Sequence, residues 1–139
     1  MKRLTNLEQL SEHAEFFPEA YPVPEEDDTI QFRANANLEV SATGASDWPI
    51  AVNVNFDVTA RLGQQQKDNV ESDDDYERLF HIELMLRCKF DDNAIDSDTQ
   101  RDEARAAIWP YCRERLMRVI RDFPVNVPEL PYQFYAGSR

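Results

Sequence analysis

The chain has 139 residues, of which 42% are hydrophobic and 11% aromatic, so its composition indicates one folded domain with a modest core and excludes a disordered chain. Its formal net charge of −12 repels nucleic-acid phosphates and anionic lipid, so no nucleic acid is expected as a partner. No stretch approaches the roughly 18 apolar residues of a membrane helix and no signal peptide is recognisable, which predicts a cytoplasmic protein without membrane insertion.

The N-terminal residues 5–16 are predicted to form a short helix. Thr5 and Glu8 have the spacing of a capping box, in which two side chains satisfy backbone groups at a helix start. The apolar residues that recur three or four apart on one side are Leu7, Leu10 and Ala14.

Residues 16–28, FFPEAYPVPEEDD, contain three prolines and end in four consecutive acids, a composition typical of a linker. The chain is therefore divided into a short helix with an acidic, proline-rich linker over residues 1–28 and an α+β domain over residues 29–139.

Three segments alternate apolar and polar residues with the period of two that predicts β-strands, namely 29–40, 50–62 and 77–90. Their expected inward sets are Ile30, Phe32, Ala34, Ala36, Leu38 and Val40; Ile50, Val52, Val54, Phe56, Val58, Ala60 and Leu62; and Phe80, Ile82, Leu84, Leu86, Cys88 and Phe90. Three such strands in succession predict an antiparallel meander with one apolar face and one wet face.

A long helix after residue 97 is expected to cover the apolar face, with Ser97 and Gln100 capping its start. From Pro110 onward, the apolar stripe that can dock on the sheet consists of Cys112, Leu116, Val119, Ile120 and Phe123. Pro110 removes one helical hydrogen bond, so either the helix kinks there or a new helix begins there. The predicted fold class is α+β, an antiparallel sheet of three to four long strands covered by one long kinked C-terminal helix.

Catalytic and metal chemistry are not indicated, and neither a cofactor nor a metal is expected. His13 and His81 are the only histidines, and His81 is expected on the wet face as an ordinary surface residue. Cys88 and Cys112 lie among apolar residues in different elements and are predicted to be buried free thiols. A disulfide between them is the alternative that the sequence allows.

The sequence WPYCRERL, residues 109–116, resembles the aromatic-Pro-Tyr-x-Arg-Glu signature of the SecB family of export chaperones and its SecB-like relatives. The matching residues are Trp109, Pro110, Tyr111, Arg113 and Glu114. Downstream, residues 123–134 resemble the family's apolar, proline-containing segment through Pro124, Pro128, Leu130, Pro131 and Phe134. The resemblance covers roughly residues 29–135.

This resemblance implies a holdase that binds unfolded or aggregation-prone proteins without ATP and without being an enzyme. SecB-type proteins are homotetramers, built as dimers of dimers with the long helices between dimers. The general export factor delivers clients to the SecA motor, whereas some relatives guard an antitoxin in a toxin–antitoxin system. A specialised SecB-like chaperone is favoured here, with the family's first strand supplied by residues 14–24 or replaced by the N-terminal helix.

The expected oligomer interface on the long helix comprises Trp109, Tyr111, Arg113, Glu114 and Met117. Tyr111 and Met117 fall outside the apolar stripe, so they either meet a second subunit or are ordinary surface residues.

The client site is expected along the proline-spaced tail and beside the second strand, comprising Trp48, Val127, Leu130, Tyr132, Phe134 and Tyr135. Prolines keep the tail extended, as a groove wall for unfolded chain requires. The alternative is that the tail caps its own core. The alternative function is an acidic interaction protein that mimics nucleic acid and binds one basic folded partner, although the acids lie mostly in loops.

Overall fold

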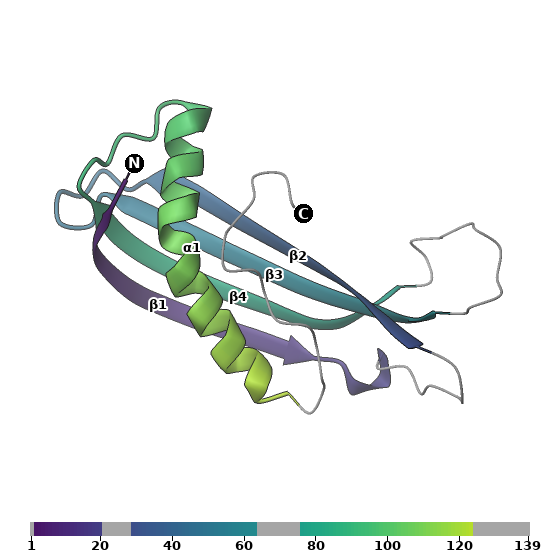
Figure 1. The fold of residues 1–139 in the computed structure, drawn as a ribbon. Coiled ribbons are helices and arrows are strands. Elements are labelled where there is room, and N and C mark those ends of the chain that lie inside the picture. Colours follow the sequence, from purple (N-terminus) through teal and green to yellow (C-terminus); the bar gives the residue numbers. More distant parts are fainter. Residues whose placement is uncertain (1, 21–28, 64–75, 124–139) are drawn as a thin grey trace.

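The structure of this chain, a computed structural model, describes residues 2–20, 29–63 and 76–123 (Figure 1). The elements in this part of the chain are β1 (Leu4–Phe16), the short 3-10 helix η1 (Pro18–Ala20), β2 (Thr29–Ala42), β3 (Ile50–Gly63), β4 (Glu77–Phe90) and α1 (Asp98–Arg121). The predicted α+β class is confirmed, because the strands form one antiparallel sheet and the long C-terminal helix lies across it.

The sheet has the order β1-β4-β3-β2, so the predicted meander of three strands forms its centre and one edge. β2 and β3 pair without interruption from Thr29 opposite Gly63 to Ala42 opposite Ile50. The turn between them contains Gly44, whose φ of 80° is readily adopted only by glycine. β1 pairs with β4 and forms the other edge.

The predicted helix over residues 5–16 is wrong, because this segment is the edge strand β1. The Thr5 hydroxyl donates to the Lys89 carbonyl at 3.0 Å and does not cap a helix. Two register irregularities, between Leu4 and Asn6 and between Gln9 and Ser11, break the period of two that would have revealed a strand. Pairing with β4 forms hydrogen bonds to backbone groups that would otherwise be left at an open edge of the sheet. These hydrogen bonds outweigh the local sequence preference of this segment for a helix.

The core lies between the sheet and α1. The residues predicted to face inward on the two central strands are at most 3% exposed, except Leu62, which is partly exposed. The buried residues are Ile50, Val52, Val54, Phe56, Val58 and Ala60 of β3, and Phe80, Ile82, Leu84, Leu86, Cys88 and Phe90 of β4. Burial of one face of both strands confirms the alternation expected from the sequence.

Helix α1 begins where the sequence predicts it. Ser97 is the N-cap, its side chain accepts from the Gln100 backbone N–H, and the Gln100 side chain accepts from the Ser97 N–H. Pro110 lies inside the helix, which continues through it, and Figure 1 shows the helix axis changing direction about halfway along. The kink is therefore confirmed and a separate second helix is excluded.

The helix crosses the sheet from the β2 edge to the β1 edge (Figure 1). Near its start, the Arg105 Nε donates to the Leu38 carbonyl of β2 at 2.8 Å. Beyond its end, the Phe123 ring stacks on Phe16 of β1, with centroids 5.2 Å apart. The predicted stripe faces the core, with Cys112, Leu116, Val119 and Ile120 buried and Phe123 partly buried.

Candidate functional site

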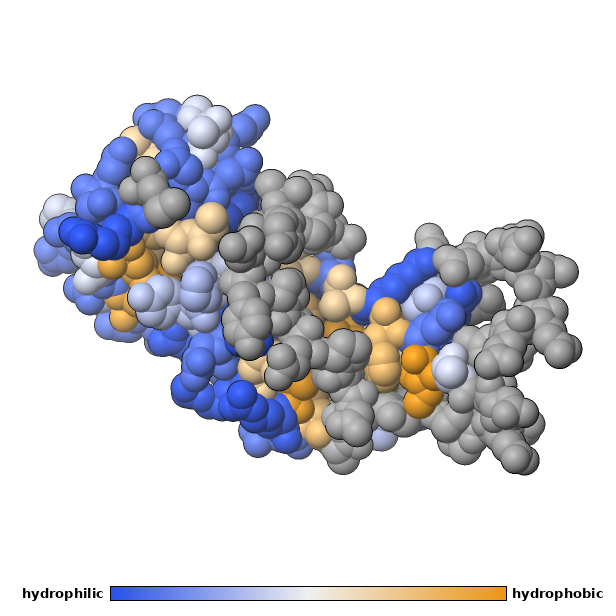
Figure 2. Space-filling view, in the orientation of Figure 1, coloured by the Kyte–Doolittle hydropathy of each residue, from blue (hydrophilic) through white to orange (hydrophobic). Residues whose placement is uncertain are grey.

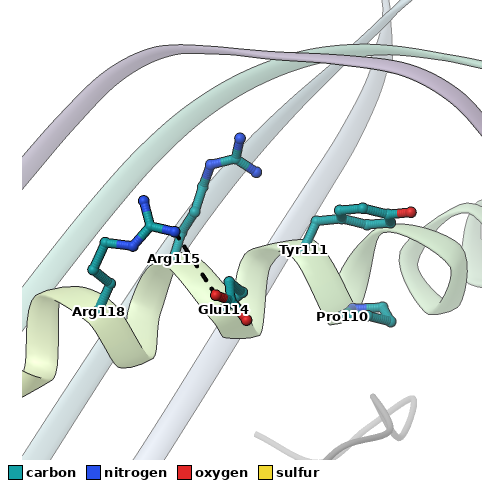
Figure 3. A pocket seen from close by; sticks show the side chains of 5 residues that line it. All are labelled: Pro110, Tyr111, Glu114, Arg115 and Arg118. Carbon is teal, nitrogen blue, oxygen red and sulfur yellow. Dashed lines mark ion pairs between the residues drawn. The ribbon is translucent and has the colours of Figure 1, made fainter.

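The side of α1 around its proline carries a hollow of about 380 Å³ (Figure 3). Among the described residues, those that line it all come from this helix and are Pro110, Tyr111, Glu114, Arg115 and Arg118. Tyr111 is 46% exposed, which is high for a large aromatic side chain. Glu114 and Arg118 form an ion pair at 3.7 Å on one flank. The hollow thus combines an exposed ring, a helix bend and charges of both signs, features suited to contact with another protein surface.

The residues predicted for an oligomer interface are distributed over different sides of the helix. Tyr111 and Glu114 are exposed and line the same hollow. Arg113 and Met117 are partly buried, and Met117 packs against the core cluster. Trp109 is only 2% exposed and lies in the core of its own chain, so its side chain offers no surface to a partner. The structure therefore brings together two of the five residues at one surface.

The apolar face of β2 is less covered than that of its neighbours. Leu38, next to the helix, is 1% exposed. Towards the start of the strand, Ile30, Phe32 and Ala36 are only partly buried and Ala34 is exposed. Figure 2 shows hydrophobic residues at the surface on this side, beyond the helix towards the right-hand end of the sheet. These four residues are here called the β2 shelf, an apolar surface that one diagonal helix leaves incompletely covered.

The predicted client residues are only in part within the described chain. Trp48 is partly buried, and the Arg87 guanidinium lies 4.7 Å from its ring centroid. Arg87 also pairs with Glu8 at 2.8 Å and points away from the helix, because its neighbours along β4 are buried on the inner face. Trp48 therefore lies on the sheet face opposite α1. The tail residues Val127, Leu130, Tyr132, Phe134 and Tyr135 lie outside the described residues.

The outer face of the sheet holds a charged cluster that the sequence did not reveal. His81 of β4 lies between two carboxylates, with Nδ1 2.7 Å from Asp57 of β3 and Nε2 2.9 Å from Glu83. Its side chain is 12% exposed, so the expected ordinary surface histidine is in fact largely covered. Burial opposes the imidazolium charge, but the hydrogen bonds to Glu83 and Asp57 outweigh it and raise the pKa of His81. The same contact lowers the pKa of Glu83.

Stability is expected to depend on pH through His81. Because the pKa of His81 is raised in the folded state, its contribution to stability is fully present below the ordinary histidine pKa of about 6.5. This contribution is lost as the pH rises through the folded-state pKa. We therefore compare the free energy of unfolding of the wild type with that of His81→Gln. The wild-type value is expected to fall by about 1.5 kcal/mol relative to the variant between pH 6 and 9, which is the size of a charged hydrogen bond. Urea titrations at each pH measure this difference. His13→Gln, which removes an exposed histidine 3.1 Å from Glu15, is the control for loss of an imidazole elsewhere on the sheet. A difference between wild type and His81→Gln that stays constant over this pH range would contradict the expectation.

The two cysteines are free, and the predicted buried thiols are confirmed. Burial raises the pKa of both Cys88 and Cys112 to about 12. Both thiols are therefore protonated at neutral pH and are poor nucleophiles.

Within residues 2–20, 29–63 and 76–123, no group of three or more His, Cys, Asp or Glu side chains is arranged to hold a metal ion. In this same part of the chain, no helix is both long enough and apolar enough to span a membrane.

No protein-family model matches the sequence, and no curated protein matches it. Among solved structures, the chain is similar to the Mycobacterium tuberculosis Rv1957 SecB-like chaperone, solved in complex with a ChAD peptide from the Rv1956 HigA1 antitoxin. The two are 16% identical, the match covers 93% of this chain and 90% of that chain, and the TM-score is 0.42.

Proposed function

We propose that this protein is an ATP-independent chaperone of the holdase type, which binds unfolded or aggregation-prone proteins and is not an enzyme. The observation that carries the proposal is the β2 shelf, where Ile30, Phe32, Ala34 and Ala36 remain exposed or half-buried beside fully buried neighbours in β3. An apolar surface of this kind suits extended apolar segments, which lack a folded shape of their own. The net charge of −12 keeps such a surface soluble.

The resemblance of Trp109, Pro110, Tyr111, Arg113 and Glu114 to the SecB-family signature supports the same function. We propose a homo-oligomer, a dimer of dimers, in which the exposed side of α1 around Tyr111 contacts another subunit. The proposed client contacts are the β2 shelf and the tail residues, with Trp48 as a further contact on the opposite face of the sheet. A dedicated client such as an antitoxin is proposed in preference to general export through SecA.

Replacing Tyr132 and Phe134 together by serine tests the client site. Loss of two aromatic contacts is expected to raise the concentration needed to suppress aggregation of a denatured client about tenfold or more, because each buried aromatic contributes roughly 1.5–3 kcal/mol. Light scattering of the diluted client measures this concentration, while the oligomer mass and melting temperature should stay nearly unchanged. Leu10→Ser, at a hydrophobic side chain 51% exposed on β1, is the matched control and should behave as wild type.

Two outcomes would contradict this client site. A double variant that dissociates or melts far earlier would place the two aromatics in the protein's own core. Unchanged suppression of aggregation would show that the tail does not hold clients.

A pull-down with the wild-type protein distinguishes a general holdase, a dedicated chaperone and an acidic mimic of nucleic acid. Many unfolded apolar proteins indicate a general holdase, and one recurrent aggregation-prone protein indicates a dedicated chaperone. One basic, folded partner would instead support the acidic mimic of nucleic acid.

A further inference from the structure

The second half of α1 is basic, although the chain as a whole is acidic. Four arginines lie between residues 113 and 121 with Glu114 as the one acidic residue among them, whereas the chain has a net charge of −12. Part of this pattern has a simple cause, because Arg118 and Arg121 lie in the last turn, where the helix dipole favours positive charge. Arg115 lies before that turn, so the helix end does not account for it.

Arg115 is partly buried, and its charge is not balanced by any carboxylate of the described residues. Within residues 2–20, 29–63 and 76–123, no Asp or Glu side chain pairs with its guanidinium, whereas Arg118 pairs with Glu114 at 3.7 Å. Taking a guanidinium partly out of water costs free energy unless an anion lies near it. Arg115 is therefore a residue that would gain from a bound anion.

Tyr111, Arg115 and Arg118 project from the same side of α1. Their spacing of four and then three residues places them in one row along a helix. Figure 3 shows the Arg115 side chain extending between Tyr111 and Arg118. All three line the hollow of about 380 Å³ next to Pro110. This volume lies at the lower end of the range of roughly 300–1,000 Å³ that small-molecule sites have.

The two guanidinium groups favour one class of anion. A guanidinium presents planar pairs of N–H donors, which match the oxygen pairs of a phosphate or a carboxylate. A carboxylate carries a single negative charge, and Glu114 already offers one to Arg118 from one flank. A phosphate ester carries about −1.5 to −2 near neutral pH and has three acceptor oxygens, so it can engage both arginines. The Tyr111 ring is 46% exposed, so a flat group attached to the phosphate can stack on it.

We propose that this hollow binds a small phosphate ester, with its phosphate between Arg115 and Arg118 and its organic group against Tyr111 and Pro110. The phosphate lowers the repulsion between two neighbouring positive charges. The net charge of −12 repels long polyanions such as nucleic acids, so the local charge of two arginines selects a ligand with a single phosphate group.

Phenyl phosphate is the simplest probe, because it joins one flat ring to one phosphate group. Isothermal titration calorimetry at constant, low ionic strength compares it with inorganic phosphate, which lacks the ring, and with benzoate, which has the ring but a carboxylate. Phenyl phosphate is expected to bind about five- to tenfold more tightly than either, because each comparison probe lacks one of the two interactions.

Substitutions separate the contribution of the charge from that of the ring. R115Q and R118Q are each expected to weaken binding of phenyl phosphate and of inorganic phosphate about tenfold, and R118Q, at an exposed position, guards against a folding defect in R115Q. Y111L should weaken binding of phenyl phosphate about fivefold and leave that of inorganic phosphate nearly unchanged. R78Q is the matched control and should bind every probe as wild type does, because Arg78 is exposed and pairs with Asp57 at 3.3 Å on the sheet face opposite α1.

The proposal is overturned if phenyl phosphate does not bind, if benzoate binds as tightly, or if both R115Q and R118Q keep the wild-type affinity. A loss in R78Q equal to that in R115Q would also overturn it, because binding would then follow the overall charge and not the hollow. None of these outcomes bears on the chaperone proposal, which is tested by client aggregation and does not depend on a phosphate ester.

Discussion

Replacing Trp109 by alanine is expected to lower the free energy of unfolding by about 3–5 kcal/mol, the usual cost of removing a fully buried tryptophan. The Trp109 side chain is 2% exposed and belongs to the core between α1 and the sheet. Small domains have a total stability of about 5–15 kcal/mol, so this loss brings the variant close to unfolding. Urea denaturation followed by far-ultraviolet circular dichroism measures the change without relying on the tryptophan itself.

Tyr111→Ala is the matched control, two residues along the same helix. Because Tyr111 is 46% exposed, its removal should change the unfolding free energy of an isolated subunit by less than about 1 kcal/mol. If instead Trp109→Ala were well tolerated and dissolved an oligomer, Trp109 would face a second subunit and its place in the core would be wrong.

The central strands could be predicted from the sequence because their physical situation is simple. β3 and β4 have neighbours on both sides and bury one face, so their side chains alternate strictly between core and outer face. The start of α1 could also be predicted from the sequence, because Ser97 and Gln100 form a local capping box that depends on no distant contact.

β1 could not be predicted in the same way. Its register irregularities place Glu12 opposite Leu84 on the inner face, where a regular strand would have an apolar residue. Thr5 and Glu8 by chance have the spacing of a helix cap. The strand exists because β4 offers it an edge, and that pairing partner lies more than 60 residues away along the chain.

Site residues were harder to predict than elements. Trp109 lies three residues before Cys112, on the same side of the helix, but starting the apolar stripe at Pro110 left it out of the core. The His81 cluster depends on the register that places Asp57 opposite His81, which the alternation within one strand does not specify. The exposed β2 shelf depends on the path of α1, because only a helix that crosses the sheet diagonally leaves one corner uncovered.

Phe80→Ala is the second change expected to have a large effect, again about 3–5 kcal/mol in the free energy of unfolding. Phe80 is fully buried on β4, and its ring centroid lies 4.9 Å from Phe123 and 6.2 Å from Phe56. Phe123, just beyond the end of α1, also stacks on Phe16 of β1. The variant should therefore lose both core packing and the attachment of the helix end to the sheet.

Phe123→Ala provides the comparison for this aromatic cluster. Phe123 is only partly buried, so its removal should cost about half as much as that of Phe80. Because the two rings touch, the double variant should be less destabilised than the sum of the two single changes, by about 0.5–1.5 kcal/mol. Hydrogen exchange should show faster opening of the Val119 and Ile120 amides in Phe80→Ala than in wild type, well before global unfolding. Strict additivity, or exchange at these amides that matches the rest of α1, would mean that the helix end is held by other contacts.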